Sequence, residues 1–440
     1  MAAPTGDPDA PARATMTARP TEATHARGIK APWWVRPGLD IDPDGRLRIA
    51  GRDAEEQARE LGTPAFVYDL DRFEENVRRL GGAFERAGLK VRQRFALKAN
   101  REPEVLAALR ALGGPGERGS VGIDACSPGE VTYALAHGWR ADEISYTGTN
   151  TSEHDLDVLL AAGVHLNLDA VSQVERVGRR ASELPAGRRI GLRVNPGAGA
   201  GYHESLAYSG ERPTKFGIYP DRLDEAFAVA RRAGMTIDTI HVHAGSGWLG
   251  GDLAGFERAI EATAAMTRHA LDAGWPIEEV NVGGGLGAPA RDDELPIDVD
   301  AYAGAIARHL GPLGVIVGSE PGDYIAKDTA ILCGEVVTVE RRGDTTFVGL
   351  DLGWNINTAY FIYRFAQEIV VCRAAGAERT ERVTVAGNIN EAGDVFAEDY
   401  LMPPVAEGDI VAILNASRYH QAMASNHCLR PTGSVRFLRR

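Results

Sequence analysis

The sequence has few cysteines and no long apolar run, and both absences limit the class of protein it can encode. Its 440 residues include four cysteines, with no CxxC pair and no spacing typical of metal ligands. We therefore expect reduced thiols in a cytoplasmic protein, and no metal site. No uninterrupted apolar stretch approaches the ~18 residues of a membrane span, and the N-terminus lacks the apolar centre of an export signal. The cysteines are Cys126, Cys333, Cys372 and Cys428.

Positive charge is also in short supply. Lys and Arg number 48 against 61 Asp and Glu, which gives a formal net charge of -13. Nucleic acids and anionic membranes favour a basic protein face, so we expect neither as a partner. Hydrophobic residues make up 44% of the chain and charged residues 25%, which is typical of a globular protein.

The length predicts two domains, and the sequence changes character along the chain. Residues 1–30 contain almost no large apolar side chain and are predicted to be a disordered tail. Residues 63–330 alternate short apolar runs with amphipathic helical stretches. Residues 331–440 contain strand-like runs joined by turns rich in glycine and charge, and residues 31–62 are expected to join that later domain.

Repeated strand–helix alternation predicts an α/β protein built from parallel βαβ units. Roughly eight such units over ~250 residues is the size of a closed (β/α)8 TIM-like barrel. A doubly wound open sheet is the alternative fold. The region after residue 330 predicts a C-terminal antiparallel β domain, either a barrel or a sandwich.

Polar residues follow the apolar runs of the predicted barrel, where the carboxyl ends of the strands carry the active site. Lys98 is an example, since it directly follows the apolar run in RFALKAN (94–100). Taken alone, it would be an ordinary surface cation at a strand end. Together the strand ends gather an amine, an imidazole, an arginine, carboxylates and glycine loops around one mouth. They carry Asp69, Lys98, Asp124, Thr147, Gly148, Asp169, Arg193, Asn195, His243, Ser246, Gly283, Gly284, Gly285 and Glu320.

Two glycine-rich loops follow neighbouring late strands, NVGGGLG (281–287) and HAGSG (243–247). Glycine lets the backbone approach a ligand closely, and its N–H groups can hold a phosphate. This is also the place where such barrels commonly bind phosphate groups. Since His241 and His243 alternate along one strand, we expect them to face opposite sides, with His243 in the mouth.

From about Thr63 to its C-terminus the chain resembles the fold-type III pyridoxal-phosphate decarboxylases, the family of diaminopimelate and ornithine decarboxylases. The matching segments occur in the family's order, which makes the resemblance specific although each is short. They are FALKAN (95–100), DACSPGEV (124–131), HVHAGSG (241–247), NVGGGLG (281–287), SEPG (319–322), NEAGDVFAEDYLMP (390–403) and RYHQAMASNHCLRP (418–431).

The resemblance implies pyridoxal 5'-phosphate as cofactor, bound to Lys98 as a Schiff base, and we expect a lowered pKa for this amine. It implies that His243 lies against the pyridine ring. Glu320 would keep the pyridine nitrogen protonated, which favours decarboxylation over the racemisation seen in related enzymes with an arginine there. The phosphate would be held by Gly283, Gly284, Gly285, Ser246, Gly322 and Tyr419, and Arg193 and Asp124 would order the groups around the cofactor.

Two positions depart from the family pattern. The usual EPGR reads EPGD here, which puts Asp323 in place of an arginine, and Arg418 is a candidate for supplying the missing positive charge. The usual CESGD reads NEAGD, so Asn390 replaces a cysteine that donates a proton across the family's dimer interface. An amide is no usable acid near neutral pH. The proton would then come from His420, Tyr360 or a water.

These departures predict a specialised decarboxylase of a secondary-metabolite or siderophore pathway, and the resemblance implies a homodimer with shared active sites. Its amino-acid substrate is expected to have a polar or charged distal group. Two alternatives remain open, a racemase or epimerase on the same scaffold and a catalytically silent homologue that binds the cofactor or a partner protein. The expected substrate-binding residues are Asp323, Tyr360, Asn390, Glu391 and Arg418.

Overall fold

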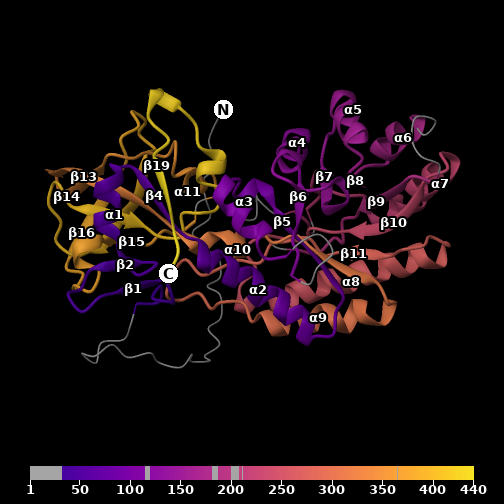
Figure 1. The fold of residues 1–440 in the computed structure, drawn as a ribbon, viewed down its shortest axis with the longest axis horizontal. Coiled ribbons are helices and arrows are strands. Elements are labelled where there is room, and N and C mark those ends of the chain that lie inside the picture. Colours follow the sequence, from indigo (N-terminus) through magenta and orange to yellow (C-terminus); the bar gives the residue numbers. More distant parts are fainter. Residues whose placement is uncertain (1–31, 114–118, 181–186, 200–207, 211, 364) are drawn as a thin grey trace.

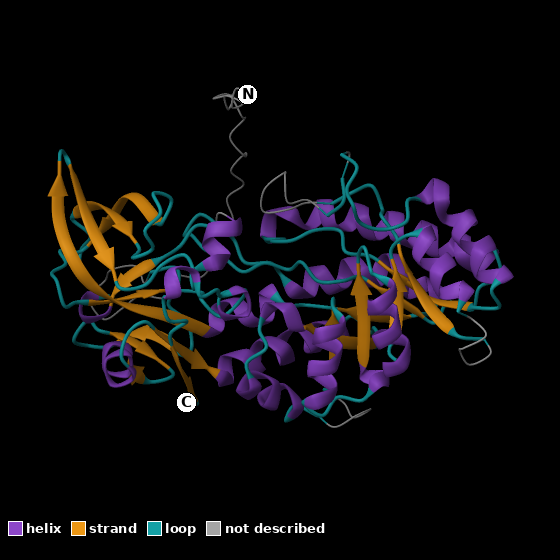
Figure 2. Ribbon diagram, turned by 90° about the horizontal axis from the view of Figure 1, so that it is seen from above, coloured by secondary structure: helices purple, strands orange, loops and turns teal. Residues whose placement is uncertain are grey.

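The computed structural model describes residues 32–113, 119–180, 187–199, 208–210, 212–363 and 365–440. Two parts lie side by side along its longest axis, one in which helices surround a set of strands and one in which strands dominate (Figures 1 and 2). The predicted tail, residues 1–30, lies outside the described residues. Within the described ranges, no helix is both long enough and apolar enough to cross a membrane.

Eight parallel strands close into a barrel in chain order, and the last strand pairs with the first. This closure confirms the TIM-like barrel and excludes the open doubly wound sheet. Most of the strand residues are buried, as expected of parallel strands that are covered on both faces. The strands are β5 (Val91–Ala96), β6 (Gly122–Ala125), β7 (Ile144–Gly148), β8 (His165–Leu168), β9 (Arg189–Arg193), β10 (Thr236–His241), β11 (Glu279–Asn281) and β12 (Ile316–Ser319).

Amphipathic helices surround this barrel, and several of them begin at a residue whose side chain caps the helix. Asp69 caps α2 by accepting a hydrogen bond from the Arg72 N–H, and Ser127 and Ser152 cap α4 and α5 in the same way. Because a helix returns the chain after each strand, the carboxyl ends of all the strands open onto one mouth. The helices are α2 (Leu70–Arg86), α3 (Pro103–Arg110), α4 (Pro128–Ala136), α5 (Glu153–Ala162), α6 (Val171–Arg179), α7 (Leu223–Arg232), α8 (Leu253–Asp272), α9 (Val299–Leu310) and the short α10 (Asp323–Ala326).

The C-terminal β domain is confirmed, although its strand pairing is mixed. Most pairs are antiparallel, but β14 with β16 and β19 with β4 are parallel. Residues 32–62 add a small sheet and a helix, which pack on this domain through a cluster that includes Trp34, Leu47 and Ile331. The elements are β1 (Leu39–Ile41), β2 (Leu47–Ile49), β3 (Arg52–Asp53), α1 (Ala54–Leu61), β13 (Ala330–Arg342), β14 (Thr345–Leu350), α11 (Thr358–Tyr363), β15 (Ile369–Val371), β16 (Glu381–Ala386), β17 (Val395–Met402), β18 (Ile410–Ile413) and β19 (Ser434–Leu438).

One strand differs from the prediction. The apolar run that follows residue 63 forms β4 (Ala65–Asp69), which pairs with β13 and β19 of the β domain and not with any barrel strand. All five of its residues are buried, so its composition suits either domain. The barrel strands therefore begin at β5, while α2, which follows β4, packs against the barrel helix α9.

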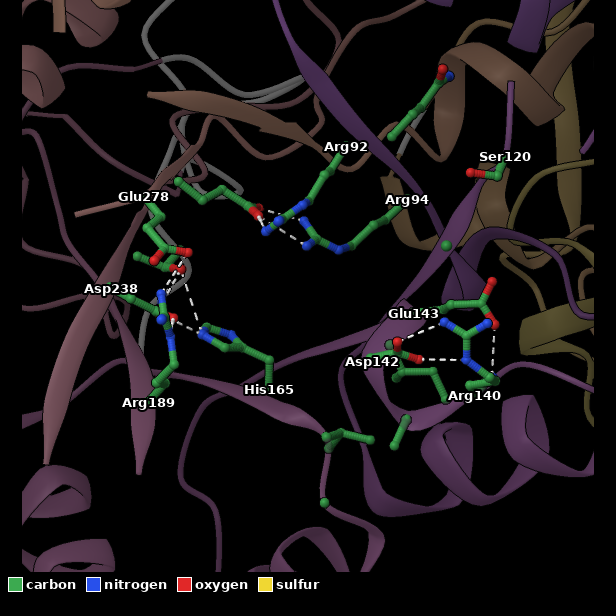
Figure 3. A pocket seen from close by; sticks show the side chains of 18 of the residues that line it. Arg92, Arg94, Ser120, Arg140, Asp142, Glu143, His165, Arg189, Asp238 and Glu278 are labelled. Atoms are coloured by element: carbon green, nitrogen blue, oxygen red, sulfur yellow. Dashed lines mark hydrogen bonds and ion pairs between the residues drawn. The ribbon is translucent and has the colours of Figure 1, made fainter. Parts of the chain in front are cut away.

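The amino-terminal mouth of the barrel is an open polar cavity of about 1240 Å³, crossed by ion pairs (Figure 3). Glu279 is its buried anchor and accepts hydrogen bonds from Arg94 (Nη1–Oε1, 2.5 Å) and Arg92 (Nη1–Oε2, 2.9 Å). Burial opposes ionisation of Glu279, but the two arginines outweigh it and lower its pKa below the ordinary value. These contacts join β11 to β5, two strands on either side of β12.

We expect Glu279→Ala to lower the free energy of unfolding by about 3–5 kcal/mol, because it leaves the buried Arg94 without its counter-ion. Urea denaturation followed by tryptophan fluorescence measures the change. The matched control is Glu278→Ala, since Glu278 is half exposed in its ion pair with Arg189, and loss of an exposed pair costs less than about 1 kcal/mol. Equal losses in the two variants would contradict the anchoring role of Glu279.

Candidate active site

A second cavity, of about 270 Å³, lies at the carboxyl ends of the barrel strands, where they face the β domain. It is smaller than the amino-terminal cavity but collects the residues predicted to carry chemistry. Tyr363, Phe365 and Tyr419 of the β domain complete its wall. The predicted site residues that line it are Lys98, Asp124, Arg193, His243, Ser246, Gly285, Glu320, Gly322, Asp323 and Tyr419.

Lys98 lies in a short 3-10 turn that directly follows β5. The turn is tied to the β domain, since the Tyr419 N–H donates to the Ala99 carbonyl (2.8 Å) and Asn100 Nδ2 donates to the Ser417 carbonyl (3.0 Å). Burial would lower the pKa of Lys98, but the nearby Asp124 carboxylate outweighs it and raises that pKa well above the ordinary value. The expected lowered pKa is therefore wrong for this structure, because a carboxylate and not a cation dominates the surroundings of the amine.

Asp124 is the penultimate residue of β6 and is 5% exposed. Burial, and then the charge of Glu320, raise its pKa well above the ordinary value. Its Oδ1 has no hydrogen-bond partner among the described residues, although it is buried at the cavity. A buried acceptor left in this state suits a ligand that supplies a donor.

Glu320 follows β12 and is held as a carboxylate. It accepts hydrogen bonds from Asn281 Nδ2 (2.6 Å at Oε1) and from His241 Nε2 (2.9 Å at Oε2). Burial alone would favour the neutral acid, but His241, Arg94 and Asn281 together lower the pKa of Glu320 to about 2. The cavity wall therefore carries a fixed negative charge.

His241 was expected to face away from the mouth, and this is wrong. The two histidines are two residues apart, and side chains at positions i and i+2 of an extended strand point to the same face. Both histidines therefore line the cavity. His241 holds the Glu320 carboxylate through the hydrogen bond from its Nε2.

His243 is a neutral imidazole, because burial and the neighbouring Lys98 and Arg193 charges lower its pKa well below the ordinary value. Its Nδ1 accepts a hydrogen bond from the Gly284 N–H (3.3 Å). The ring stands edge-on to Tyr208, with centroids 4.5 Å apart. An uncharged ring fixed at both sides offers a flat face to a ligand.

The glycine loops form a cradle of backbone donors. Within the described residues, the N–H groups of Ser246, Gly285 and Gly322 have no acceptor, and all three residues line the cavity. A Cβ on Gly285 would overlap the Gly245 carbonyl oxygen, so the two loops can only meet through glycine. Gly283 and Gly284 do not line the cavity, and they serve this close packing instead.

Comparison with known proteins settles the family. The model described as pyridoxal-dependent decarboxylase, pyridoxal binding domain, matches residues 70–327. The chain belongs to the pyridoxal-dependent decarboxylases. It is 38% identical to the diaminopimelate decarboxylase of Methanothermobacter thermautotrophicus, with 90% of this chain and 91% of that protein covered.

Solved structures agree with this assignment. Diaminopimelate decarboxylase from M. jannaschii in complex with L-lysine has a TM-score of 0.82 and 25% identity, covering 91% of this chain and 93% of that one. The Helicobacter pylori enzyme complexed with L-lysine has a TM-score of 0.78 and 26% identity, covering 87% and 93%. The predictions of a pyridoxal-phosphate cofactor and of amino-acid decarboxylase activity are confirmed.

The cavity of this decarboxylase fits pyridoxal phosphate. The free N–H groups of Ser246, Gly285 and Gly322 suit a phosphate, and Tyr419 adds a hydroxyl. For a bound pyridoxal phosphate, Lys98 would supply the amine, the neutral His243 a flat face, and Glu320 a carboxylate for a protonated ring nitrogen. Arg193, stacked on Phe216 at 4.5 Å, adds a buried cation to the same wall.

Other predicted residues of the decarboxylase lie outside this cavity. Asn390 and Glu391 are exposed in the turn between β16 and β17. Tyr360 packs edge-on to Phe396, and His420 is buried behind the wall. Arg418 is also buried behind the wall, where its Nε lies 2.6 Å from Asp323 Oδ1.

Sequence reasoning missed several wall residues besides His241. Cys126 follows β6 by one residue and could have been found from its place in the DACS segment; burial raises the pKa of its thiol to about 12. Tyr208 and Phe216 lie in the long connection after β9, which carries no strand-end signal. Tyr363 and Phe365 come from the β domain, so only the folded chain brings them to the barrel.

We expect His241→Ala to shift the acidic limb of the pH dependence of kcat/KM to higher pH. Glu320 is expected to act as a carboxylate, so the enzyme should lose activity when this group takes up a proton. That happens as the pH falls through the pKa of Glu320, which is about 2 in the wild-type protein. Loss of its strongest stabilising partner raises that pKa, so protonation begins at higher pH. Rates of CO2 release across pH measure the shift.

His165→Ala is the control, because this histidine pairs with Asp238 (2.9 Å) at the opposite mouth. An acidic limb that stays in place in His241→Ala would rule out His241 as the group that positions the Glu320 charge.

Proposed function

We propose that this decarboxylase removes the α-carboxylate of an amino acid whose far end is polar or charged, with its cofactor attached covalently to Lys98. Lys98 is the only lysine that lines the cavity within the described residues. The observation that carries the proposal is the Glu320 carboxylate, kept ionised in a buried wall by His241 and Asn281.

Each side chain has a role that follows from its surroundings. Pyridoxal phosphate, when bound, supplies a conjugated ring that accepts the electron pair left on the α carbon. Glu320 keeps a proton on the ring nitrogen, and His243 supports the ring without adding charge. Asp124 offers an unsatisfied buried oxygen beside the amine of Lys98. This arrangement favours loss of CO2 over reversible proton exchange.

Two neighbouring residues support a shared site: Asn390, at the position of the family's proton donor, and Glu391, which is expected to contact the far end of the substrate. They are exposed on a surface that also holds a stacked aromatic cluster, in which Trp354 lies 5.0 Å from the rings of both Phe361 and His427. His427 Nε2 is 3.7 Å from Glu391 Oε1. Leu429, 87% exposed, lies beside them. An exposed aromatic and apolar surface of this kind suits a second copy of the chain.

We therefore propose a homodimer in which the turn that carries Asn390 and Glu391 completes the cavity of the other subunit. A substrate with a polar or charged end would meet Glu391 there. The change from the family's cysteine to Asn390 favours a substrate of a specialised pathway over a common one, because it alters the group presented to the reacting end.

Diaminopimelate is the second candidate substrate. The 38% identity to a diaminopimelate decarboxylase over nine-tenths of the chain favours it. Glu391, retained from the family pattern, is consistent with a substrate that has a charged distal end. A substrate panel must therefore include diaminopimelate, lysine and ornithine with other D- and L-amino acids.

We expect the wild-type protein to release CO2 from at least one amino acid of this panel and Lys98→Ala to release none. Borohydride reduction followed by peptide mass spectrometry should place the cofactor on Lys98. Lys327→Met is the control, because Lys327 is a buried lysine that does not line the cavity. Solvent deuterium entering the α position with the carboxylate retained would support a racemase instead, and no turnover on any amino acid would support a silent homologue.

The shared site is tested by mixing two inactive variants, Lys98→Ala and Glu391→Ala. In a dimer with shared sites, random reassociation gives hybrids with one intact site, so about a quarter of the wild-type activity should return. Each variant mixed with itself is the control. If mixing restores no activity although both variants reassociate, each chain holds a complete site.

A further inference from the structure

The contact between Asp323 and Arg418 joins the two domains at the cavity. Asp323 begins α10 of the barrel, and Arg418 follows β18 of the β domain. Their side chains meet at 2.6 Å and are 7% and 2% exposed. Ion pairs buried to this extent carry a large desolvation cost, so removal of either partner has a measurable effect.

Both partners are adjacent in sequence to a residue of the phosphate cradle. Gly322, which lines the cavity and whose N–H has no acceptor among the described residues, precedes Asp323, and Tyr419 follows Arg418. Asp323 itself lines the cavity, so a carboxylate lies at the end where the backbone donors gather. A phosphate bound there would be repelled by an uncompensated Asp323.

Arg418 is placed to compensate this charge. Burial raises the pKa of Asp323, and Arg418 is the strongest group that opposes the rise, ahead of Lys327. The Phe365 ring lies 3.8 Å from the Arg418 guanidinium carbon and itself lines the cavity. The arginine is therefore fixed between an aromatic face and the carboxylate.

The segment around Arg418 is also fixed by the backbone. Tyr419 has a left-handed conformation, with φ of 57°, which is uncommon for a residue with a side chain. Its carbonyl accepts a hydrogen bond from Thr358 Oγ1 (2.9 Å), and its N–H donates to Ala99, the residue after Lys98. A shift of Arg418 would thus reach both Tyr419 and the lysine turn.

We infer that Arg418 is a positioning residue that neutralises Asp323 and so lets the cavity accept a phosphate dianion beside a carboxylate. The inference rests on the proposed function, because that function places the phosphate against Ser246, Gly285 and Gly322. It also explains how the chain accommodates an aspartate where the family has an arginine, since the positive charge is supplied from the other domain.

The test uses the opposite consequences of removing each partner. The full-length protein is freed of cofactor and titrated with pyridoxal phosphate, and separately with pyridoxal, which lacks the phosphate. Arg418→Met leaves the carboxylate uncompensated, so its Kd for pyridoxal phosphate should rise about tenfold or more. Asp323→Asn removes the repulsion, so its Kd should stay at the wild-type value or fall. The double variant should return to within about threefold of wild type.

Affinity for pyridoxal should change little in any of these variants, because the inferred effect acts on the phosphate. The matched control is Arg72→Ala with Asp328→Asn, which breaks an Arg–Asp contact of the same 2.6 Å length away from the cavity. This control variant should have a lower free energy of unfolding but unchanged Kd values for pyridoxal phosphate and for pyridoxal.

Weaker phosphate binding in Asp323→Asn, to the same extent as in Arg418→Met, would show that the pair only joins the domains and would overturn the inference. An equal loss for pyridoxal would do the same. Asp323→Asn decides the question even if Arg418→Met does not fold. Because these titrations need no substrate, absence of CO2 release by the wild-type protein would refute the proposed function separately.

Discussion

Keeping Glu320 ionised inside the protein is the constraint on which the site depends. An isolated buried carboxylate would take up a proton, because a medium of low polarity disfavours charge. His241 from β10 and Asn281 from β11 each donate one hydrogen bond to it, and Arg94 of β5 adds a nearby positive charge. Three barrel strands must therefore close in the correct register for this charge to exist, which ties the electronic property of the site to the closure of the fold.

The barrel alone does not make the site. Tyr419, Tyr363 and Phe365 reach the cavity from the β domain, and the segment around Tyr419 is hydrogen-bonded to the turn that holds Lys98. The domain interface thus fixes the reactive amine from one side while the strand ends fix it from the other. Because β4 joins the β-domain sheet and α2, which follows it, packs on the barrel, the chain crosses between the domains before the barrel begins.

Sequence patterns predicted the barrel, the β domain and the residues at the strand ends, because each depends on local periodicity and on a rule that holds for all barrels. Lys98, Asp124, Arg193, His243 and Glu320 were found in this way, and all line one cavity. His241 was missed because it was assigned to the face opposite His243, although side chains two residues apart in a strand share a face. Tyr363 and Phe365 were missed because their position depends on the packing of two domains, and β4 was misplaced because a fully buried strand suits either sheet. The pKa of Lys98 was misjudged for a related reason, since it depends on which charge lies nearest in space.

The two departures from the family pattern differ in kind because they occupy different surroundings. Asp323 is buried, and a buried charge needs a nearby opposite charge to offset the loss of hydration. Arg418 supplies it, with its Nε 2.6 Å from Asp323 Oδ1. Asn390 is exposed in a turn, so its change is proposed to act on a molecule that approaches that surface. The first departure is therefore a rearrangement that preserves the phosphate end of the cavity. The second lies beside Glu391, the residue proposed to meet the far end of the substrate, so differences in substrate should be sought at this surface turn before the buried pair.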